Sequence, residues 1–194
     1  MKFLCSAAAV LLMTAASASA QMGDPRVAEA LKPLPDDLKV AATVVAYDKA
    51  TGARQILKQG TNQIECQPKA EDGFVRCYNK VMAPRRDMEA KLHAQKKTDK
   101  EVSDAIAAAM KDGTLKPAPF GTISYRYSDD PQRIKLLWVV SVPNATPESL
   151  GVSTTSQRDA ALAGHGMPWM MLPGTPGAHI MVPINGTPLS NPTK

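Results

Sequence analysis

Two cysteines that flank a short loop place the tightest constraint on how this chain can fold. Cys66 and Cys77 lie within segments 63–67 and 74–79, and the loop between them contains a proline and an Asp-Gly step, which is typical of a turn between strands. If the segments pair about the middle of that loop, the cysteines lie opposite each other, on the face that also carries Ile64. The sequence therefore predicts a disulfide on the apolar face of a hairpin.

The first twenty residues predict the oxidising compartment that such a bond requires. Lys2 supplies a positive start, residues 3–14 form an apolar stretch, and Ala18-Ser19-Ala20 has the small residues of a signal-peptidase site. We expect a signal peptide over 1–20, cleavage near Gln21, and a periplasmic or secreted protein. The stretch is too short for a stable membrane span, and we expect no transmembrane anchor in the mature chain.

The remaining pattern predicts one domain. Residues 21–38 are polar and proline-rich and suggest a flexible lead-in, 39–185 suggest a single α+β domain, and 186–194 suggest a loose tail. Strand patterns, then helical patterns, then further strand patterns follow one another along the domain. This order predicts an α+β fold with a largely antiparallel sheet, packed by one or two helices and held by a single disulfide.

One helix has clear signals at its start and along its length. Thr98 and Glu101 form a capping-box pattern, and Gly113 is placed to end the helix. Apolar residues then recur at helical spacing, which predicts one continuous stripe: Val102, Ala105, Ile106, Ala109 and Met110. We expect this stripe, with Ile106 at its centre, to pack on the sheet.

Two short stretches carry a resemblance. One is Gly60-Thr61-Asn62, followed by the two cysteines; the other runs from Gly174 to Pro183 and reads GTPGAHIMVP. Together with the capped helix between them, they resemble a group of small exported bacterial proteins known only as hypothetical, over roughly residues 40–184. The group has no established activity, so the resemblance implies export and a single domain.

Charge and motifs exclude several classes of protein. The net charge is +5, and one of these charges belongs to the leader. Basic residues are densest over 85–100, which we interpret as a solvated helix face. Aromatic residues do not interleave with them, so we expect no nucleic-acid partner. The common zinc, nucleotide and nucleophile-elbow motifs are missing, and we expect no catalytic residues and no cofactor.

A cluster near the C-terminus suggests one alternative. His165, Met167, His179 and Met181 combine imidazoles and thioethers, the soft ligands that suit Cu(I). The same residues also fit core packing, because Met commonly fills apolar gaps. Four aromatic residues of the later strands could line one concave face and receive a small apolar ligand: Tyr125, Tyr127, Trp138 and Trp169.

Paired carboxylates suggest a weaker alternative. Asp36-Asp37 and Asp129-Asp130 each adjoin a proline, which fits turns better than a glycosidase pair, whose members come from separate elements. The sequence thus favours an exported, non-enzymatic binding or interaction domain of unknown ligand and partner. A periplasmic copper-binding protein and a hydrolase with an unrecognised site remain the alternatives.

Overall fold

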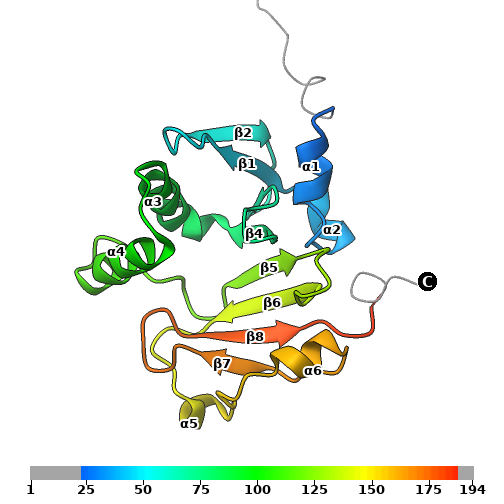
Figure 1. Ribbon diagram of the computed structural model, residues 1–194, viewed down its shortest axis with the longest axis vertical. Coiled ribbons are helices and arrows are strands. Elements are labelled where there is room, and N and C mark those ends of the chain that lie inside the picture. Colours follow the sequence, from blue (N-terminus) through cyan, green and yellow to red (C-terminus); the bar gives the residue numbers. More distant parts are fainter. Residues whose placement is uncertain (1–22, 188–194) are drawn as a thin grey trace, which may run out of the picture.

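The computed structural model describes residues 23–187 and contains one mixed sheet of eight strands (Figure 1). The expected signal peptide and most of the expected tail lie outside these residues. The strand order is β2-β1-β3-β4-β5-β6-β8-β7, and every neighbouring pair except β1 and β3 is antiparallel. The predicted fold class, α+β with a largely antiparallel sheet, is confirmed. The strands are β1 (Thr43–Tyr47), β2 (Arg54–Lys58), β3 (Ile64–Gln67), β4 (Val75–Asn79), β5 (Ile123–Tyr127), β6 (Leu136–Ser141), β7 (Trp169–Met171) and β8 (His179–Pro183).

The predicted hairpin and its disulfide are present. β3 and β4 pair with Cys66 directly opposite Cys77. The two sulfur atoms are bonded, and the Cα atoms lie 3.9 Å apart. Both cysteines are fully buried, as expected for a bond on the apolar face. We call this face of the sheet the disulfide face. The opposite face carries Arg76 and Arg126, and we call it the arginine face.

Short helices precede β1 and lie between β6 and β7, and the two longest helices lie between β4 and β5. They are α1 (Pro25–Ala30), α2 (Asp36–Lys39), the 3-10 helix η2 (Lys80–Met82), α3 (Ala83–Ala94), α4 (Asp99–Lys111), α5 (Pro147–Leu150) and α6 (Arg158–Leu162). No helix among residues 23–187 has both the length and the apolar character needed to cross a membrane.

The lead-in differs from the expected flexible segment. α1 and the loop after it bury Val27, Ala30 and Leu34 against the disulfide face. The Ala30 carbonyl oxygen lies 3.3 Å from Cys77 Sγ. These apolar residues are spaced three and four apart, as on one side of a helix, and the neighbouring prolines obscure that pattern in the sequence. The segment therefore covers the disulfide instead of leading loosely into the domain.

The arginine face is covered at its two ends by different helices. At one end, α3 lies over the first strands, where Asp87 contacts Tyr47 of β1 and Arg54 of β2. At the other end, α6 packs Ala161 into an apolar cluster with β6, β7 and β8: Ile134, Leu137, Val139, Trp169 and Met181. The part of the face formed by β4 and β5 lies between these two coverings.

The capped helix forms as predicted, but its apolar stripe has a different partner. Thr98 and Glu101 make both capping-box hydrogen bonds, and Ile106 is buried. The cluster around Ile106 contains Met88 and Leu92 of α3 and no strand residue. The prediction that the stripe packs on the sheet is therefore wrong. α3 and α4 lie side by side (Figure 1), and the apolar side chains of α3 take the place of the sheet as the partner of the stripe.

Candidate anion-binding site

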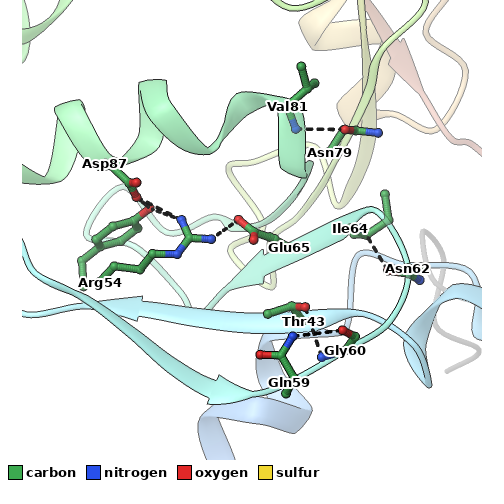
Figure 2. A network of polar contacts seen from close by, with 11 residues as sticks. Thr43, Arg54, Gln59, Gly60, Asn62, Ile64, Glu65, Asn79, Val81 and Asp87 are labelled. Atoms are coloured by element: carbon green, nitrogen blue, oxygen red, sulfur yellow. Dashed lines mark hydrogen bonds and ion pairs between the residues drawn. The ribbon is translucent and has the colours of Figure 1, made fainter.

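An ion-pair network holds α3 against the sheet. Arg54 donates to Asp87 of α3 at 3.0 Å and forms a second ion pair with Glu65 of β3 (Figure 2). The Tyr47 hydroxyl also donates to Asp87, at 2.6 Å. Although burial lowers the pKa of Arg54, its bonds to the two carboxylates raise that pKa above the ordinary value. These contacts tie α3 to β1, β2 and β3.

The turn of the first hairpin also presses on α3. Gly52 has a φ of +69°, and a Cβ at this position would lie 2.7 Å from the Lys91 backbone. Any larger residue would therefore push the hairpin and the helix apart.

Two arginines face each other at the centre of the arginine face. Arg76 of β4 lies directly opposite Arg126 of β5 in the antiparallel register. Side chains in such a position have Cβ atoms about 4.5–5.5 Å apart, and like charges there are destabilising. Arg76 has its own counter-ion, since it donates to Asp72 at 2.8 Å and its guanidinium lies 5.1 Å from the centre of the Phe74 ring. Within residues 23–187 Arg126 makes no ion pair of its own, and the Asp72 carboxylate, which is paired with Arg76, acts on it only at longer range.

Arg126 is the unpaired member of this pair. Within residues 23–187 its guanidinium makes neither a hydrogen bond nor an ion pair. Its Nε is closed off from solvent, whereas its terminal nitrogens keep some access. Burial lowers the pKa of Arg126; Tyr78 opposes this effect, Arg76 and Arg86 add to it, and the Asp72 carboxylate opposes it more weakly. Keeping a mostly buried charged group without a partner costs free energy, and such groups in folded proteins are normally paired.

The start of α3 adds two more guanidinium groups. Arg86 donates to the Tyr78 hydroxyl at 2.6 Å and lies 4.5 Å from the centre of the Tyr78 ring. Tyr78 is two residues beyond Arg76 on β4, so it shares the arginine face. Arg85 donates to Glu89 at 2.8 Å, and Arg86 also contacts that carboxylate.

Hydrogen bonding leaves Arg86 incompletely satisfied as well. Three buried side-chain nitrogens lack a partner within the described residues: Arg86 Nε, Arg126 Nε and Trp138 Nε1. The first two belong to the same group of arginines. Burial lowers the pKa of Arg86, and the charges of Arg85 and Arg76 lower it further, against an opposite effect of Tyr78.

Together, Arg76, Arg85, Arg86 and Arg126 are called the arginine cluster. Its four positive charges face two carboxylates, those of Asp72 and Glu89, so two positive charges remain unbalanced. Guanidinium groups carry planar sets of donors that match the oxygens of carboxylates and phosphates. What this arrangement can do chemically is bind an anion.

His179 lies at the edge of the arginine cluster. Burial lowers its pKa; a hydrogen bond to Gly177 opposes that effect, while the charges of Arg126 and Arg85 add to it. Its Nδ1 lies 2.8 Å from the Gly177 carbonyl oxygen. Because a carbonyl oxygen only accepts hydrogen bonds, Nδ1 carries the proton. The neutral ring therefore leaves Nε2 as an acceptor.

The residues of the copper hypothesis lie in different surroundings. His165 and Met167 are exposed in the loop after α6, His179 is half-buried, and Met181 is buried in the apolar cluster below α6. Residues 23–187 contain no group of three or more His, Cys, Asp or Glu placed to hold a metal. Copper binding by the two histidines and two methionines stays a prediction.

The carboxylate pairs and the aromatic residues have structural surroundings too. Asp36 and Asp37 lie in the first turn of α2. Asp129 pairs with Lys69 at 2.7 Å, and Asp130 accepts from the Gln132 backbone at 2.8 Å. A cavity of about 260 Å³ lies beside these two residues, next to α6.

The four aromatic residues that could have lined one concave face lie on two different faces of the sheet. Tyr125 and Trp138 pair on the disulfide face, edge to face at 5.4 Å. Tyr127 shares that face by alternation. Trp169 lies opposite Met181 and packs on the other face, below α6. The register of the last hairpin separates it from the rest.

The arginine cluster was not predicted from the sequence. The basic residues over 85–100 fit a solvated helix face in the sequence, and no motif marks Arg76 or Arg126. The signal was present in the alternation of β4 and β5, where each polar side carries an arginine. Only the packing of α3 over that side turns those arginines from solvent-exposed residues into a cluster.

The chain shows no significant match to any protein-family model, curated protein or solved structure.

Proposed function

We propose that this protein is an exported, non-enzymatic binding domain that holds an anionic ligand in the arginine cluster. The observation that carries the proposal is Arg126, a mostly buried guanidinium that makes no hydrogen bond or ion pair within residues 23–187 and has a second arginine directly opposite. Arg54, on the same face, has two carboxylate partners, so this fold can pair a buried arginine. The missing partner of Arg126 is the ligand.

The energetics support an external anion. Leaving a charged group buried and unpaired costs free energy, and placing like charges opposite each other adds to the cost. An anion that accepts hydrogen bonds from these guanidinium groups removes both costs at once. Charge-assisted bonds of this kind are roughly twice as strong as neutral ones.

Export is part of the proposal and rests on the leader. The disulfide supports it, because such bonds persist in oxidising compartments. N-terminal sequencing of the secreted or periplasmic protein is expected to begin within a residue or two of Gln21. Cytoplasmic protein that retains Met1 would contradict this part alone.

Thermal unfolding in the presence of different anions tests the binding site. The purified domain is compared with Arg126→Met and with Arg26→Met, which removes one equal charge from an exposed position on α1. Phosphate, sulfate, acetate and citrate are added at matched ionic strength. We expect at least one of them to raise the midpoint of the parent and of Arg26→Met, but not that of Arg126→Met.

Two results would overturn the binding proposal. One is a parent that no anion stabilises beyond a chloride control. The other is an Arg126→Met variant that responds as the parent does, since any binding would then lie elsewhere.

A further inference from the structure

We infer that the ligand of the arginine cluster is a tetrahedral dianion, namely a phosphate group. This inference rests on the proposed function and names the chemical class that the site takes. Three features of the site favour a phosphate group: its charge, the number of its donors and the directions from which those donors reach it.

Charge favours a dianion over a carboxylate. The arginine cluster has four positive charges and two carboxylate partners, which leaves an excess of two. Arg133 adds a further charge nearby, on the Phe74 ring at 5.3 Å. A monoanion would leave the buried cluster positively charged, whereas a dianion neutralises the excess within it. Phosphate esters carry a charge of about −1.5 to −2 at neutral pH.

Donor number points to the same class. Arg126 brings terminal nitrogens that have no partner among residues 23–187 and keep some access to solvent. On α3, Arg86 Nε is closed off from solvent, whereas Arg85 uses only its Nε for Glu89 and keeps its terminal nitrogens. Arg76 extends from the strand beside Arg126, on the same face. A carboxylate is satisfied by one guanidinium in a two-point contact, while a phosphate group has three acceptor oxygens. Donors that reach the site from β4, β5 and α3 suit a phosphate group, whose oxygens point in several directions.

The donors are also held in place. Arg86 is fixed by the ring and the hydroxyl of Tyr78, and Arg76 by Asp72 and Phe74. The helix that carries Arg86 is tied to the sheet through Arg54 and Asp87. Because these groups are ordered before a ligand arrives, binding loses little side-chain entropy.

Isothermal titration with small anions tests the inference directly. The probes are sulfate, which stays a dianion, inorganic phosphate at about pH 8, where its dianion predominates, and acetate as the monoanion. All are used at equal ionic strength in chloride buffer. We expect one-to-one binding of sulfate and phosphate, with acetate weaker by about tenfold or more, since one lost charged hydrogen bond corresponds to at least this factor.

Variants locate the bound anion. Arg126→Met is expected to weaken phosphate binding by about tenfold or more, and Arg126→Lys by less, because lysine keeps the charge but lacks the planar donor set. Arg26→Met is the control and should bind as the parent does. In NMR titrations, saturation with sulfate should raise the pKa of His179, since the anion offsets the nearby charges of Arg126 and Arg85. Binding elsewhere would leave this pKa unmoved.

The outcomes separate this inference from the proposed function. If acetate binds as tightly as phosphate, and both depend on Arg126, the dianion inference fails and the anion site stands. If no anion binds, or binding is unchanged in Arg126→Met, both fail.

The source of the phosphate group is tested by two further probes. Binding of glycerol phosphate as tight as that of inorganic phosphate would indicate a soluble phosphate ester or free phosphate. Binding of phosphatidic acid vesicles, but not of phosphatidylcholine vesicles, would indicate a lipid headgroup. Either result supports a phosphate group as the ligand, while rejection of both probes and of inorganic phosphate by a domain that binds sulfate would overturn it.

Discussion

Arg54 and Arg126 show how neighbours decide what one side chain does. Both are partly exposed arginines on the same face of the same sheet. Arg54 joins two carboxylates on two different elements and ties α3 to the sheet (Figure 2). Arg126 has another arginine opposite and makes no ion pair with a carboxylate of residues 23–187. The first stabilises the fold, and the second keeps its donors for a ligand.

Replacing these two arginines should therefore affect stability in opposite ways. Arg54→Met is expected to lower the free energy of unfolding by about 1.5–3 kcal/mol, because it breaks charged hydrogen bonds and leaves Glu65 unpaired. Arg126→Met should leave that free energy unchanged or raise it, in buffer without multivalent anions, because it removes repulsion from Arg76. Urea denaturation measures both. An equal loss in the two variants would show that Arg126 has a structural partner.

Glu101 is a second case in which hydrogen bonds set a property of one residue. Bonds from the Thr98 backbone, from Lys97 and from the Thr98 hydroxyl lower its pKa from the ordinary 4.5 to about 2. The lowered value means that the carboxylate stabilises the folded state above pH 4.5, and that this contribution is lost as the pH falls toward about 2.

An NMR titration of the Glu101 carboxyl carbon checks this value. We expect a midpoint near 2 in the parent. Thr98→Ala should raise that pKa, because it removes the hydroxyl that donates to the carboxylate. A parent midpoint at the ordinary value would show that the capping box is open in solution.

At the scale of elements, α4 is the clearest example of a helix predicted correctly with a wrong partner. Its cap, length and buried stripe follow from local signals in the sequence. Its packing on α3 does not follow from those signals, because an apolar stripe predicts a buried face but does not specify which element packs on it. The same holds for β4 and β5, whose alternation predicts two faces but not what lies on each.

Substitutions in α4 can separate packing on α3 from packing on the sheet. Ile106→Ala should destabilise the domain by about 2–5 kcal/mol, as other truncations of buried Ile or Leu do. Leu92→Ala on α3 should be coupled to it in a double-mutant cycle by about 0.5–3 kcal/mol, since the two side chains share a cluster. Leu137→Ala on β6, in a different cluster, should be additive with Ile106→Ala. Coupling to Leu137 instead of Leu92 would place α4 on the sheet.

At the scale of the whole molecule, the disulfide joins the two strands over which α1 closes. Val27, Ala30 and Leu34 pack in the same core cluster as Cys66 and Cys77. The bond and the N-terminal helix therefore stabilise one region together.

Removing the disulfide should lower the stability of this region first. The double variant Cys66→Ala, Cys77→Ala is expected to lose roughly 3 kcal/mol, the value for a ring of about this size. Hydrogen exchange should show the loss of protection in α1 along with β3 and β4, because they share a core. Unchanged protection in α1 would mean that the helix packs independently of the bond.

In the parent protein, mass measurement without reduction should show two hydrogens fewer than the reduced chain.

The sequence by itself determined the local features of this protein. Cys66 and Cys77 could be paired from the loop between them, and Thr98 could be assigned as a cap from Glu101, because such interactions act over a few residues. Alternation and helical spacing likewise located the strands and the main helices. What these signals could not locate was the site, whose members Arg76, Arg86 and Arg126 are far apart in the chain.

Only the tertiary structure brought those arginines together. Strand register placed Arg76 opposite Arg126, and the ion pairs of Arg54 placed the start of α3 above them. Both depend on contacts between distant parts of the chain, whose energies decide the fold but leave no pattern along the sequence. A guanidinium is solvated or buried, paired or unpaired, according to what packs around it. The excess charge on the arginine face is therefore a property of the folded molecule.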